Sequence, residues 1–134
     1  MDRLEKLCAE KGMRMTDQRR VVARILSTAT DHPDVEELHR RAHAVDPKIS
    51  IATVYRTIKA MVDDGELQPV DVPGEPPRYE RAELGHHHHF HCRGCDKVYD
   101  VHACPRDIEK LAPSGFKLEG HAVMLFGRCG ECRA

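Results

Sequence analysis

The chain has 134 residues, 40% of them hydrophobic and 32% charged, and its formal net charge at pH 7 is -1. This length suits one ordinary domain or two small ones, and the composition excludes a chain that is disordered throughout. No apolar run approaches the ~20 residues of a membrane span, and the first residues lack the apolar core of a signal peptide, so we expect a cytosolic protein with no membrane partner. A net charge near zero excludes a general positive field, so any DNA binding must come from a local basic patch.

Four amphipathic helices are predicted in the first part of the chain. Their start and stop signals are Gly12, the caps Thr16, Asp34 and Ser50, the capping-box partner Glu37, and the stops Pro47 and Gly65. Apolar residues recur at the three- and four-residue spacing of helices with one buried face. The residues expected to face the core are Leu4, Leu7, Cys8, Val21, Val22, Ile25, Leu26, Ala29, Val35, Leu38, Ala42, Ile51, Val54, Ile58, Met61 and Val62.

Two short strands should follow the last of these helices. The stretches 67–72 and 78–80 flank the segment 73–77, whose Pro and Gly residues favour a tight loop. The third and fourth helices together with this hairpin predict a winged helix-turn-helix. A plain helical core is the alternative that periodicity by itself leaves open.

The outward face of the fourth predicted helix favours DNA binding. The residues expected to point away from the core are Thr53, Arg56, Thr57, Lys59 and Ala60. Small and hydroxyl residues permit close approach to a groove, Arg56 and Lys59 suit phosphate or guanine, and Tyr55 suits the methyl group of thymine. An upstream basic segment could add contacts to the DNA backbone; it comprises Lys11, Arg14, Arg19, Arg20 and Arg24.

Cysteine and histidine are concentrated near the end of the chain. Five of the six cysteines lie at or beyond Cys92, and seven of the ten histidines lie at or beyond His86. The pairs Cys92/Cys95 and Cys129/Cys132 are two CxxC turns, which together provide the tetrahedral S4 site that structural zinc prefers. A thioredoxin-like redox pair is the alternative, but that motif is normally single. Because so short a segment buries little core, we expect zinc to supply folding free energy here.

A run of histidines precedes the first CxxC. If this run is extended, alternate side chains point to opposite faces, so that His87 and His89 face one way and His86 and His88 the other. One strand can therefore serve two metal sites, each with partners from elsewhere. His91 shares the face of His87 and His89 but could simply pack or hydrogen-bond. A solvated polyhistidine loop is the alternative interpretation.

Further ligands are scarce. The candidates are His32 between two helices, Glu80 at the end of the hairpin, Asp100 in an alternating stretch, Asp107 at the start of a short helix, and His121 in a predicted strand, 121–126. For His32 alone, a capping or surface role is favoured. Cys8 and Cys104 have no CxxC partner: we expect Cys8 to be a buried apolar residue, and for Cys104 packing is favoured over an accessory ligand or a redox thiol.

Together these motifs resemble the ferric uptake regulator family over nearly the whole chain. The matching stretches are 11–20 (KGMRMTDQRR), 50–57 (SIATVYRT), the histidine run and the two CxxC pairs. The resemblance implies a homodimeric winged-helix repressor whose C-terminal α/β domain dimerises and which divalent metal closes onto operator DNA. The implied fold class is α+β, with a winged-helix domain at 1–81, a hinge at 82–85 and a metal-binding dimerisation domain at 86–134.

The resemblance also implies site residues. Structural Zn2+ would be held by Cys92, Cys95, Cys129 and Cys132, the regulatory metal by His32, Glu80, His87, His89 and Asp100, and an additional site would comprise His86, His88, Asp107 and His121. Tyr55 and Arg56 match DNA-facing positions of the recognition helix and Arg14 matches a residue that reaches the minor groove; Arg19 and Thr53 complete the predicted DNA contacts. His88 stands where iron-responsive members often have aspartate, and Asp96 where glycine often follows the CxxC.

We therefore predict a metal-dependent transcriptional repressor and not an enzyme. The mixed nitrogen and oxygen ligand set, with Ala82 where zinc-sensing relatives often have cysteine, favours Fe2+ as the regulatory metal, with Mn2+ or Zn2+ as alternatives. Zinc-sensing and peroxide-sensing members are the nearest alternatives; Asp100 resembles a ligand of the peroxide sensors, whereas Glu80 is usually aspartate in them. A zinc hydrolase would have only Glu80 as a general base, and a metal-storage protein would leave the helix-turn-helix unexplained.

Overall fold

The structure is a computed structural model that describes residues 2–82 and 85–133, and the chain divides into two compact units, Met1–Leu84 and Gly85–Ala134. Of the hinge predicted at 82–85, residues 83 and 84 lie outside the described residues. No helix within the described ranges is long and apolar enough to span a membrane.

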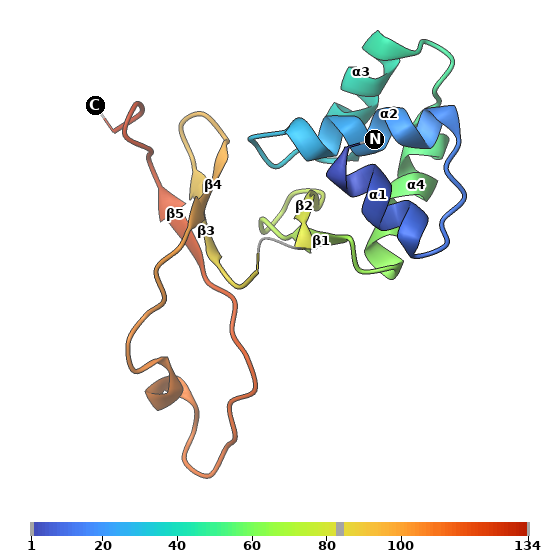
Figure 1. Cartoon of the computed structure of the whole chain (residues 1–134). Helices are drawn as coiled ribbons and strands as arrows, with labels where there is room; N and C mark the ends of the chain where they lie inside the picture. The colour runs from blue at the N-terminus through green and yellow to red at the C-terminus, as the bar shows by residue number, and fades with distance from the viewer. Residues whose placement is uncertain (1, 83–84, 134) are drawn as a thin grey trace. The chain divides into compact units, whose positions relative to one another are not determined.

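The first unit is a group of short helices followed by a hairpin (Figure 1). Its elements are α1 (Arg3–Glu10), α2 (Asp17–Thr28), α3 (Val35–Val45), α4 (Ile51–Asp63), β1 (Leu67–Val70) and β2 (Arg78–Arg81). The side chains of Thr16, Asp34 and Ser50 each accept the backbone N–H three residues later, at 3.2, 2.8 and 3.1 Å. These predicted caps are therefore confirmed, and each satisfies a backbone donor that the helix itself leaves unpaired.

The capping box predicted at the start of α3 forms only its first half. Asp34 accepts the backbone N–H of Glu37, but the Glu37 carboxylate accepts hydrogen bonds from the Arg40 and Arg41 guanidinium groups, at 2.6 and 2.9 Å. Arg40, with Arg41, holds the pKa of Glu37 at about 2, well below its ordinary range. The Glu37 carboxylate therefore pairs with arginines along the helix surface instead of bonding back to the start of the helix.

The core of the first unit lies where the helices meet the hairpin. Its buried apolar residues are Leu4, Cys8, Val22, Ala23, Leu26, Leu38, Ala42, Ile49, Val54, Ile58, Met61 and Leu67. Two predictions on α4 are wrong. Ile51, in the first turn, is 50% exposed, whereas Ile49 just before the helix is buried. Thr57 is buried, and its hydroxyl donates to the Thr53 carbonyl at 2.8 Å, which satisfies the hydroxyl within the helix.

The hairpin follows α4 after a glycine turn. Gly65 has a φ of 84°, the left-handed conformation that commonly ends a helix at glycine, as predicted. β1 and β2 pair antiparallel, with Val70 opposite Arg78. The first strand is two residues shorter than predicted, although Val72 beyond it is still buried. α3, α4 and the hairpin make up the predicted winged helix-turn-helix.

The second unit is built on a three-stranded sheet in the order β4-β3-β5. Its strands are β3 (His88–Cys92), β4 (Val98–Val101) and β5 (Met124–Gly127). The central strand β3 pairs antiparallel with β4 and parallel with β5. The connection from β4 to β5 is a long excursion from the sheet that carries the 3-10 helix η2 (Ile108–Leu111) (Figure 1). The strand predicted at 121–126 starts only at Met124, so His121 lies before it.

Candidate metal centres and nucleic-acid interface

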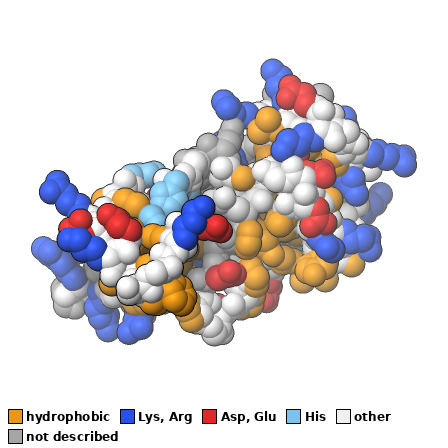
Figure 2. Space-filling model, turned by 90° about the horizontal axis from the view of Figure 1, so that it is seen from below, with side chains coloured by type: hydrophobic (Ala, Val, Ile, Leu, Met, Phe, Trp, Pro, Cys, Tyr) orange, Lys and Arg blue, Asp and Glu red, His pale blue; other side chains and the backbone are white. Residues whose placement is uncertain are grey.

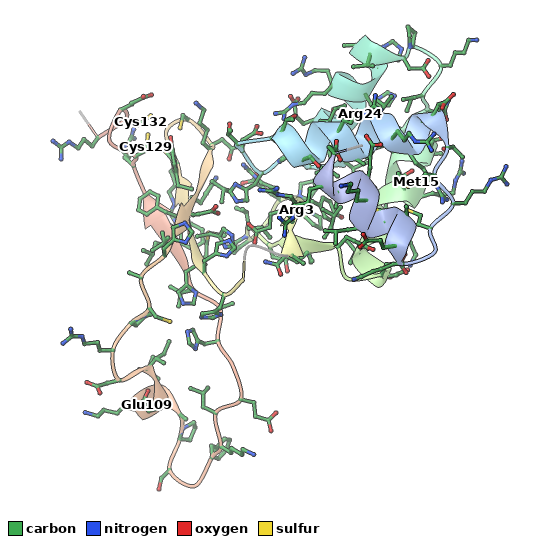
Figure 3. The ribbon with its side chains drawn as sticks, in the orientation of Figure 1. Arg3, Met15, Arg24, Glu109, Cys129 and Cys132 are labelled. Carbon is green, nitrogen blue, oxygen red and sulfur yellow. The ribbon has the colours of Figure 1, made fainter. Side chains whose placement is uncertain are left out.

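The two CxxC turns of the second unit converge. Cys92 ends β3 and Cys95 follows in the turn, while Cys129 and Cys132 lie close together after β5 (Figure 3). All four Sγ atoms are within 4.8 Å of one another, and those of Cys95 and Cys129 are 3.9 Å apart. Zinc with bonds of ~2.3 Å to four sulfur atoms in a tetrahedron places those atoms about 3.8 Å apart. The four cysteines therefore fit a closed S4 zinc site.

The surroundings of two of these cysteines, Cys92 and Cys129, favour the thiolate form that binds metal, whereas the neighbouring sulfur atoms of Cys129 and Cys92 raise the pKa of Cys132. The backbone N–H groups of Cys129 and Cys95 donate to Cys92 Sγ at 3.3 and 3.4 Å and lower the pKa of Cys92 to about 6. The Tyr99 hydroxyl lowers the pKa of Cys129 in the same sense. Donors aimed at sulfur stabilise its negative charge before any metal arrives.

The geometry of the turn after β3 accounts for the residue types at positions 94 and 96. A Cβ on Gly94 would lie 2.9 Å from Cys132 Cβ, so a larger residue would push the second CxxC pair away. Asp96 has a φ of 65°, in the left-handed region that favours glycine, and its carboxylate contacts His91 Nε2 at 2.6 Å. Asp96 thus occupies a glycine-type position, and His91 makes the hydrogen bond considered for it.

His87, His89 and Asp100 gather on one face of β3. Nε2 of His87 and Nε2 of His89 lie 3.4 and 3.7 Å from Asp100 Oδ1, and the two imidazole rings are 4.7 Å apart. Asp100 is held opposite His89 by the β3–β4 ladder. The space-filling view shows histidine side chains gathered in one patch (Figure 2). The second unit by itself therefore offers two imidazoles and a carboxylate that one divalent ion could share.

His32 and Glu80 form a pair within the first unit. His32 Nε2 lies 3.0 Å from Glu80 Oε2, and the Gln68 side-chain amide donates to Glu80 Oε1 at 2.7 Å. Gln68 faces Glu80 across the hairpin, which holds the carboxylate in place. The capping or surface role favoured for His32 from sequence is therefore wrong, because the side chain is buried and paired with a carboxylate, and the two residues are candidate metal ligands.

The opposite face of β3 collects a second histidine group. His86, His88 and His121 lie together as the alternating pattern indicated, and Cys104 joins them. Asp107 is not part of the group: its carboxylate lies 3.7 Å from Lys110 Nζ at the start of η2. The packing role favoured for Cys104 from sequence is wrong, because its side chain is exposed among these histidines, where the accessory-ligand alternative would place it. Its position could not be inferred from spacing, because it lies 16 residues beyond His88 on the far side of a turn.

Of the predicted DNA-facing residues, Arg14, Tyr55 and Arg56 are exposed, whereas Arg19 and Thr53 are half-buried. Tyr55 is 56% exposed and Arg56 is exposed on α4, while Thr53 is half-buried near its start and accepts a bond from Ser50 Oγ. In the upstream basic segment, the Arg19 guanidinium donates to the Arg14 carbonyl at 2.9 Å. That bond ties the segment before α2 to the helix.

Comparison with known proteins assigns the chain to a family. The model of the ferric uptake regulator family matches residues 10–126. The chain belongs to the ferric uptake regulator family. It is 46% identical to a ferric uptake regulation protein of Rhizobium leguminosarum bv. viciae, over 92% of this chain and 89% of that protein.

Solved structures of ferric uptake regulator relatives share the fold. A zinc-bound manganese uptake regulator is 44% identical, with a TM-score of 0.78 over 96% of this chain and 99% of that chain. The ferric uptake regulator of Helicobacter pylori, whose structure is described as revealing three functional metal binding sites, is 27% identical, with a TM-score of 0.79 over 100% of this chain and 98% of that chain. As a member of this family, the chain is a metal-responsive transcriptional regulator.

Proposed function

We propose that the chain is an iron-responsive repressor that acts in the cytosol as a homodimer on operator DNA. In this proposal Cys92, Cys95, Cys129 and Cys132 hold structural Zn2+, and the regulatory metal is bound by His32, Glu80, His87, His89 and Asp100. The observation that carries the metal assignment is the convergence of His87 and His89 on Asp100, because imidazole and carboxylate without thiolate suit Fe2+ or Mn2+ better than a zinc-selective site.

Regulation would work by a population shift. The paired His32 and Glu80 belong to the first unit, and the convergent His87, His89 and Asp100 belong to the second. Ligands from both units, once joined by one ion, would favour those arrangements of the dimer in which two recognition helices reach successive major-groove faces. Decisive control requires the ion to prefer that arrangement by several kcal/mol, which a multi-ligand site can supply.

DNA contact would come from α4 and the basic segment before α2. Tyr55 and Arg56 would meet base edges or phosphate, Thr53 would lie near the groove, and Arg14 and Arg19 would contact the DNA backbone. The exposure of Tyr55 and Arg56 supports this assignment, since neither side chain is used in the core.

The central experiment is anaerobic fluorescence anisotropy of DNA under buffered free Fe2+, Mn2+ or Zn2+. DNA from upstream of the encoding gene is compared with fragments selected from a random library, so that a missing operator cannot mimic a missing function. We expect Fe2+ to activate sequence-specific, salt-dependent binding at free concentrations where Zn2+ does not. No metal-dependent binding to any selected fragment would contradict a repressor and favour a storage protein or a hydrolase.

Manganese is the second candidate for the regulatory metal. The observation that favours it is the 44% identity to a manganese uptake regulator, close to the 46% identity to a ferric uptake regulation protein. Fe2+ and Mn2+ accept the same ligand types, so only the competing titrations separate them. Activation by Mn2+ at lower free concentrations than Fe2+ would make this a manganese-responsive regulator.

Replacing His87 tests the regulatory site directly. His87→Ala removes an imidazole from the group around Asp100 and leaves the four cysteines untouched, so we expect a folded, zinc-containing protein whose DNA affinity no longer responds to metal. His43→Ala, on the exposed side of α3, is the control for loss of a histidine. An unchanged metal response in His87→Ala would place the sensing site elsewhere.

Replacing Arg56 tests the DNA-facing side of α4. Arg56→Ala should weaken specific binding by about 1–3 kcal/mol, or roughly 5- to 150-fold, because a good base contact contributes that much. The matched control is Arg106→Ala, an exposed arginine of the second unit. Equal losses from both variants would show that only overall charge matters.

A further inference from the structure

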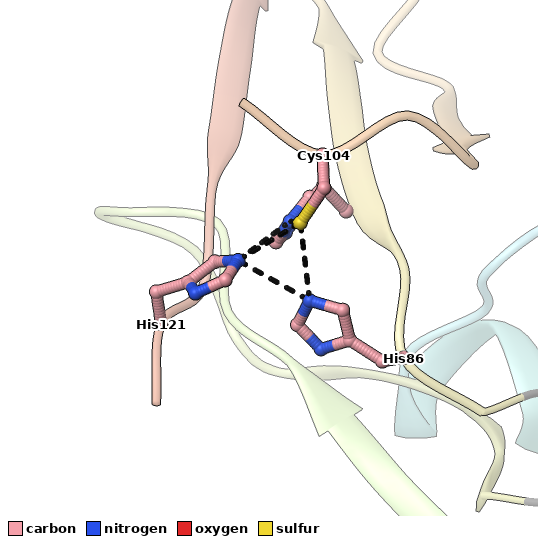
Figure 4. Close-up of side chains that lie close together, drawn as sticks. His86, Cys104 and His121 are labelled. Carbon is pink, nitrogen blue, oxygen red and sulfur yellow. Dashed lines mark hydrogen bonds between the residues drawn. The ribbon is translucent and has the colours of Figure 1, made fainter. Parts of the chain in front are cut away.

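A side-chain cluster of the second unit lies outside the proposed regulatory site and on the other face of β3. It consists of His86 just before β3, His88 at the start of β3, Cys104 after β4 and His121 before β5. Figure 4 shows His86, Cys104 and His121. Their candidate ligand atoms all lie within 4.8 Å of one another. His86 and Cys104 are exposed and His121 is half-buried, so the cluster can be reached from solvent.

Hydrogen bonds by themselves do not account for this cluster. His121 Nε2 lies 3.3 Å from His86 Nε2, 3.2 Å from His88 Nε2 and 3.1 Å from Cys104 Sγ. An imidazole nitrogen has either one proton or one lone pair, so it can form one good hydrogen bond in its ring plane and not three. Several lone pairs aimed at a common centre are the arrangement that a cation stabilises.

The protonation of His88 follows from its contact with the backbone. The Val123 N–H donates to His88 Nδ1 at 3.2 Å, so that nitrogen must carry the lone pair. The proton of neutral His88 is then on Nε2, which lies 3.2 Å from both Cys104 Sγ and His121 Nε2 and can donate to the sulfur, because a thiolate keeps further lone pairs when it binds a metal and an imidazole nitrogen does not. His88 therefore supports the sulfur as a hydrogen-bond donor, and His86, Cys104 and His121 are left as the three groups with free lone pairs.

Two of the three spacings among these groups match those around a small tetrahedral ion, and the spacing of Cys104 and His121 is shorter. Bonds of about 2.05 Å to nitrogen and 2.3 Å to sulfur place two nitrogens about 3.3 Å apart, and a nitrogen and a sulfur about 3.6 Å apart. The observed distances are 3.3 Å for His86 to His121, 3.6 Å for Cys104 to His86 and 3.1 Å for Cys104 to His121.

We propose that His86, Cys104 and His121 bind a zinc-class ion through Nε2, Sγ and Nε2, with His88 as the hydrogen-bond donor that positions the thiolate. The thiolate makes this site soft, in contrast to the nitrogen and oxygen ligands proposed for the regulatory metal, so the two faces of β3 would select different metals. Three protein ligands leave a fourth position to water or an external ligand. Asp107, with its carboxylate beside Lys110, has no part in the site.

The test uses Co2+ as a spectroscopic probe on the full-length, zinc-containing protein. A thiolate bound to Co2+ gives a near-ultraviolet charge-transfer absorption that imidazole and carboxylate do not. We expect this band in the wild type and in Asp107→Asn, and its loss in Cys104→Ser. Exchange of Co2+ into the four-cysteine site would give the same band in all variants, so the wild-type minus Cys104→Ser difference isolates the new site.

Zinc competition and alkylation supply independent readouts. Zn2+ should abolish the band and protect Cys104 from iodoacetamide, and Cys104→Ser should weaken this zinc binding by at least about 10-fold, since losing even an outer-shell partner costs 10- to 100-fold. Cys8→Ala, which removes the buried thiol of the first unit, should change neither readout. Equal alkylation with and without Zn2+, or loss of metal in Asp107→Asn but not in Cys104→Ser, would overturn the proposal.

The role of His88 has its own signature. His88→Ala should keep the Co2+ band but move it to longer wavelength, because the sulfur loses a hydrogen bond that lowers its lone-pair energy, and His88→Gln, which retains an N–H donor, should partly restore it. Complete loss of Co2+ binding in His88→Ala would make His88 a ligand instead. All these readouts are separate from DNA binding, so a failure here leaves the regulatory proposal standing.

Discussion

The helical unit and the sheet unit differ in how much apolar surface they bury. In the first unit all four helices contribute side chains to one apolar cluster. Among the described residues of the second unit, the buried apolar side chains are Cys92 and Val98, whereas Leu111 and Phe116 are 81% and 71% exposed. Burial of apolar surface can fold the first unit, but the second needs another source of free energy, and converging cysteines can provide it through a metal.

The exposed apolar side chains of the second unit also fit a partner surface. Phe126 and Leu125 on β5 are 40% and 44% exposed, in addition to the two residues of the excursion between β4 and β5. Apolar side chains left outside a core are expected where a second copy covers them. The homodimer proposed above would therefore complete the core that the single chain lacks.

Breaking the four-cysteine site should have the largest effect and act on one unit only. Cys92→Ser removes a ligand whose sulfur also accepts two backbone N–H groups, and structural zinc sites contribute roughly 10–16 kcal/mol to folding. We expect loss of zinc, dimer and sheet together, with the helices retained, as measured by metal content, sedimentation and amide hydrogen exchange. A folded, zinc-free dimer from Cys92→Ser would remove the contrast between the two units.

A core substitution in α4 should have the opposite effect: it should destabilise the first unit and leave the zinc site of the second intact. Ile58→Ala should lower the free energy of unfolding of the first unit by about 2–5 kcal/mol, because it opens a cavity among buried side chains, and should leave zinc content unchanged. Ile51→Ala is a matched control on the same helix, since Ile51 is half exposed and surface changes usually stay within about 0.5 kcal/mol. Urea unfolding followed by helical circular dichroism measures both. Equal effects would mean that Ile51 is covered in solution.

The smallest predicted effect concerns pH and the surface of α3. The pKa of Glu37 is lowered to about 2 from an ordinary value of 4.5 by Arg40 and Arg41. A lowered pKa in the folded state means that the contribution is complete above about pH 4.5 and is lost as the pH falls toward 2. The stability difference between wild type and Glu37→Gln should therefore shrink in acid, measured by thermal unfolding. Zinc loss in acid affects wild type and variant alike and cancels in the comparison. A stability difference that stays the same at all pH values would show that the pairing of Glu37 with Arg40 and Arg41 contributes nothing.

Local signals predicted the first unit well. Caps at Thr16, Asp34 and Ser50 depend on residues three positions apart, and the structure confirms each of them. The errors at Ile51 and Thr57 have a common cause: periodicity gives the direction of a side chain but not how far the core extends along the helix. Burial of Thr57 is tolerated because its hydroxyl donates a hydrogen bond to the backbone carbonyl of Thr53.

Long-range pairing limited the prediction of the second unit. The alternation of the histidines could be read from β-strand geometry, and the CxxC spacing indicated one cluster of thiolates. The parallel pairing of β3 with β5 joins His89 to Met124, and no local pattern specifies it. Cys104 reaches His88 through the antiparallel pairing of β3 with β4, whereas His121 arrives through the parallel pairing with β5, so neither their meeting nor the displacement of Asp107 could be inferred from spacing.

The central position of β3 has a consequence for insertions and deletions. Hydrogen bonds to β4 and β5 fix its register on both edges, while His86 and His88 face one way and His87 and His89 the other. Because these ladders hold His88 and His89 in place, adding or removing one residue between His87 and His88 would exchange the faces of His86 and His87 and separate each from its partner, whereas a change of two residues would restore the alternation. The number of residues between His86 and the strand can therefore change by two but not by one, and an odd change would be more damaging than many substitutions.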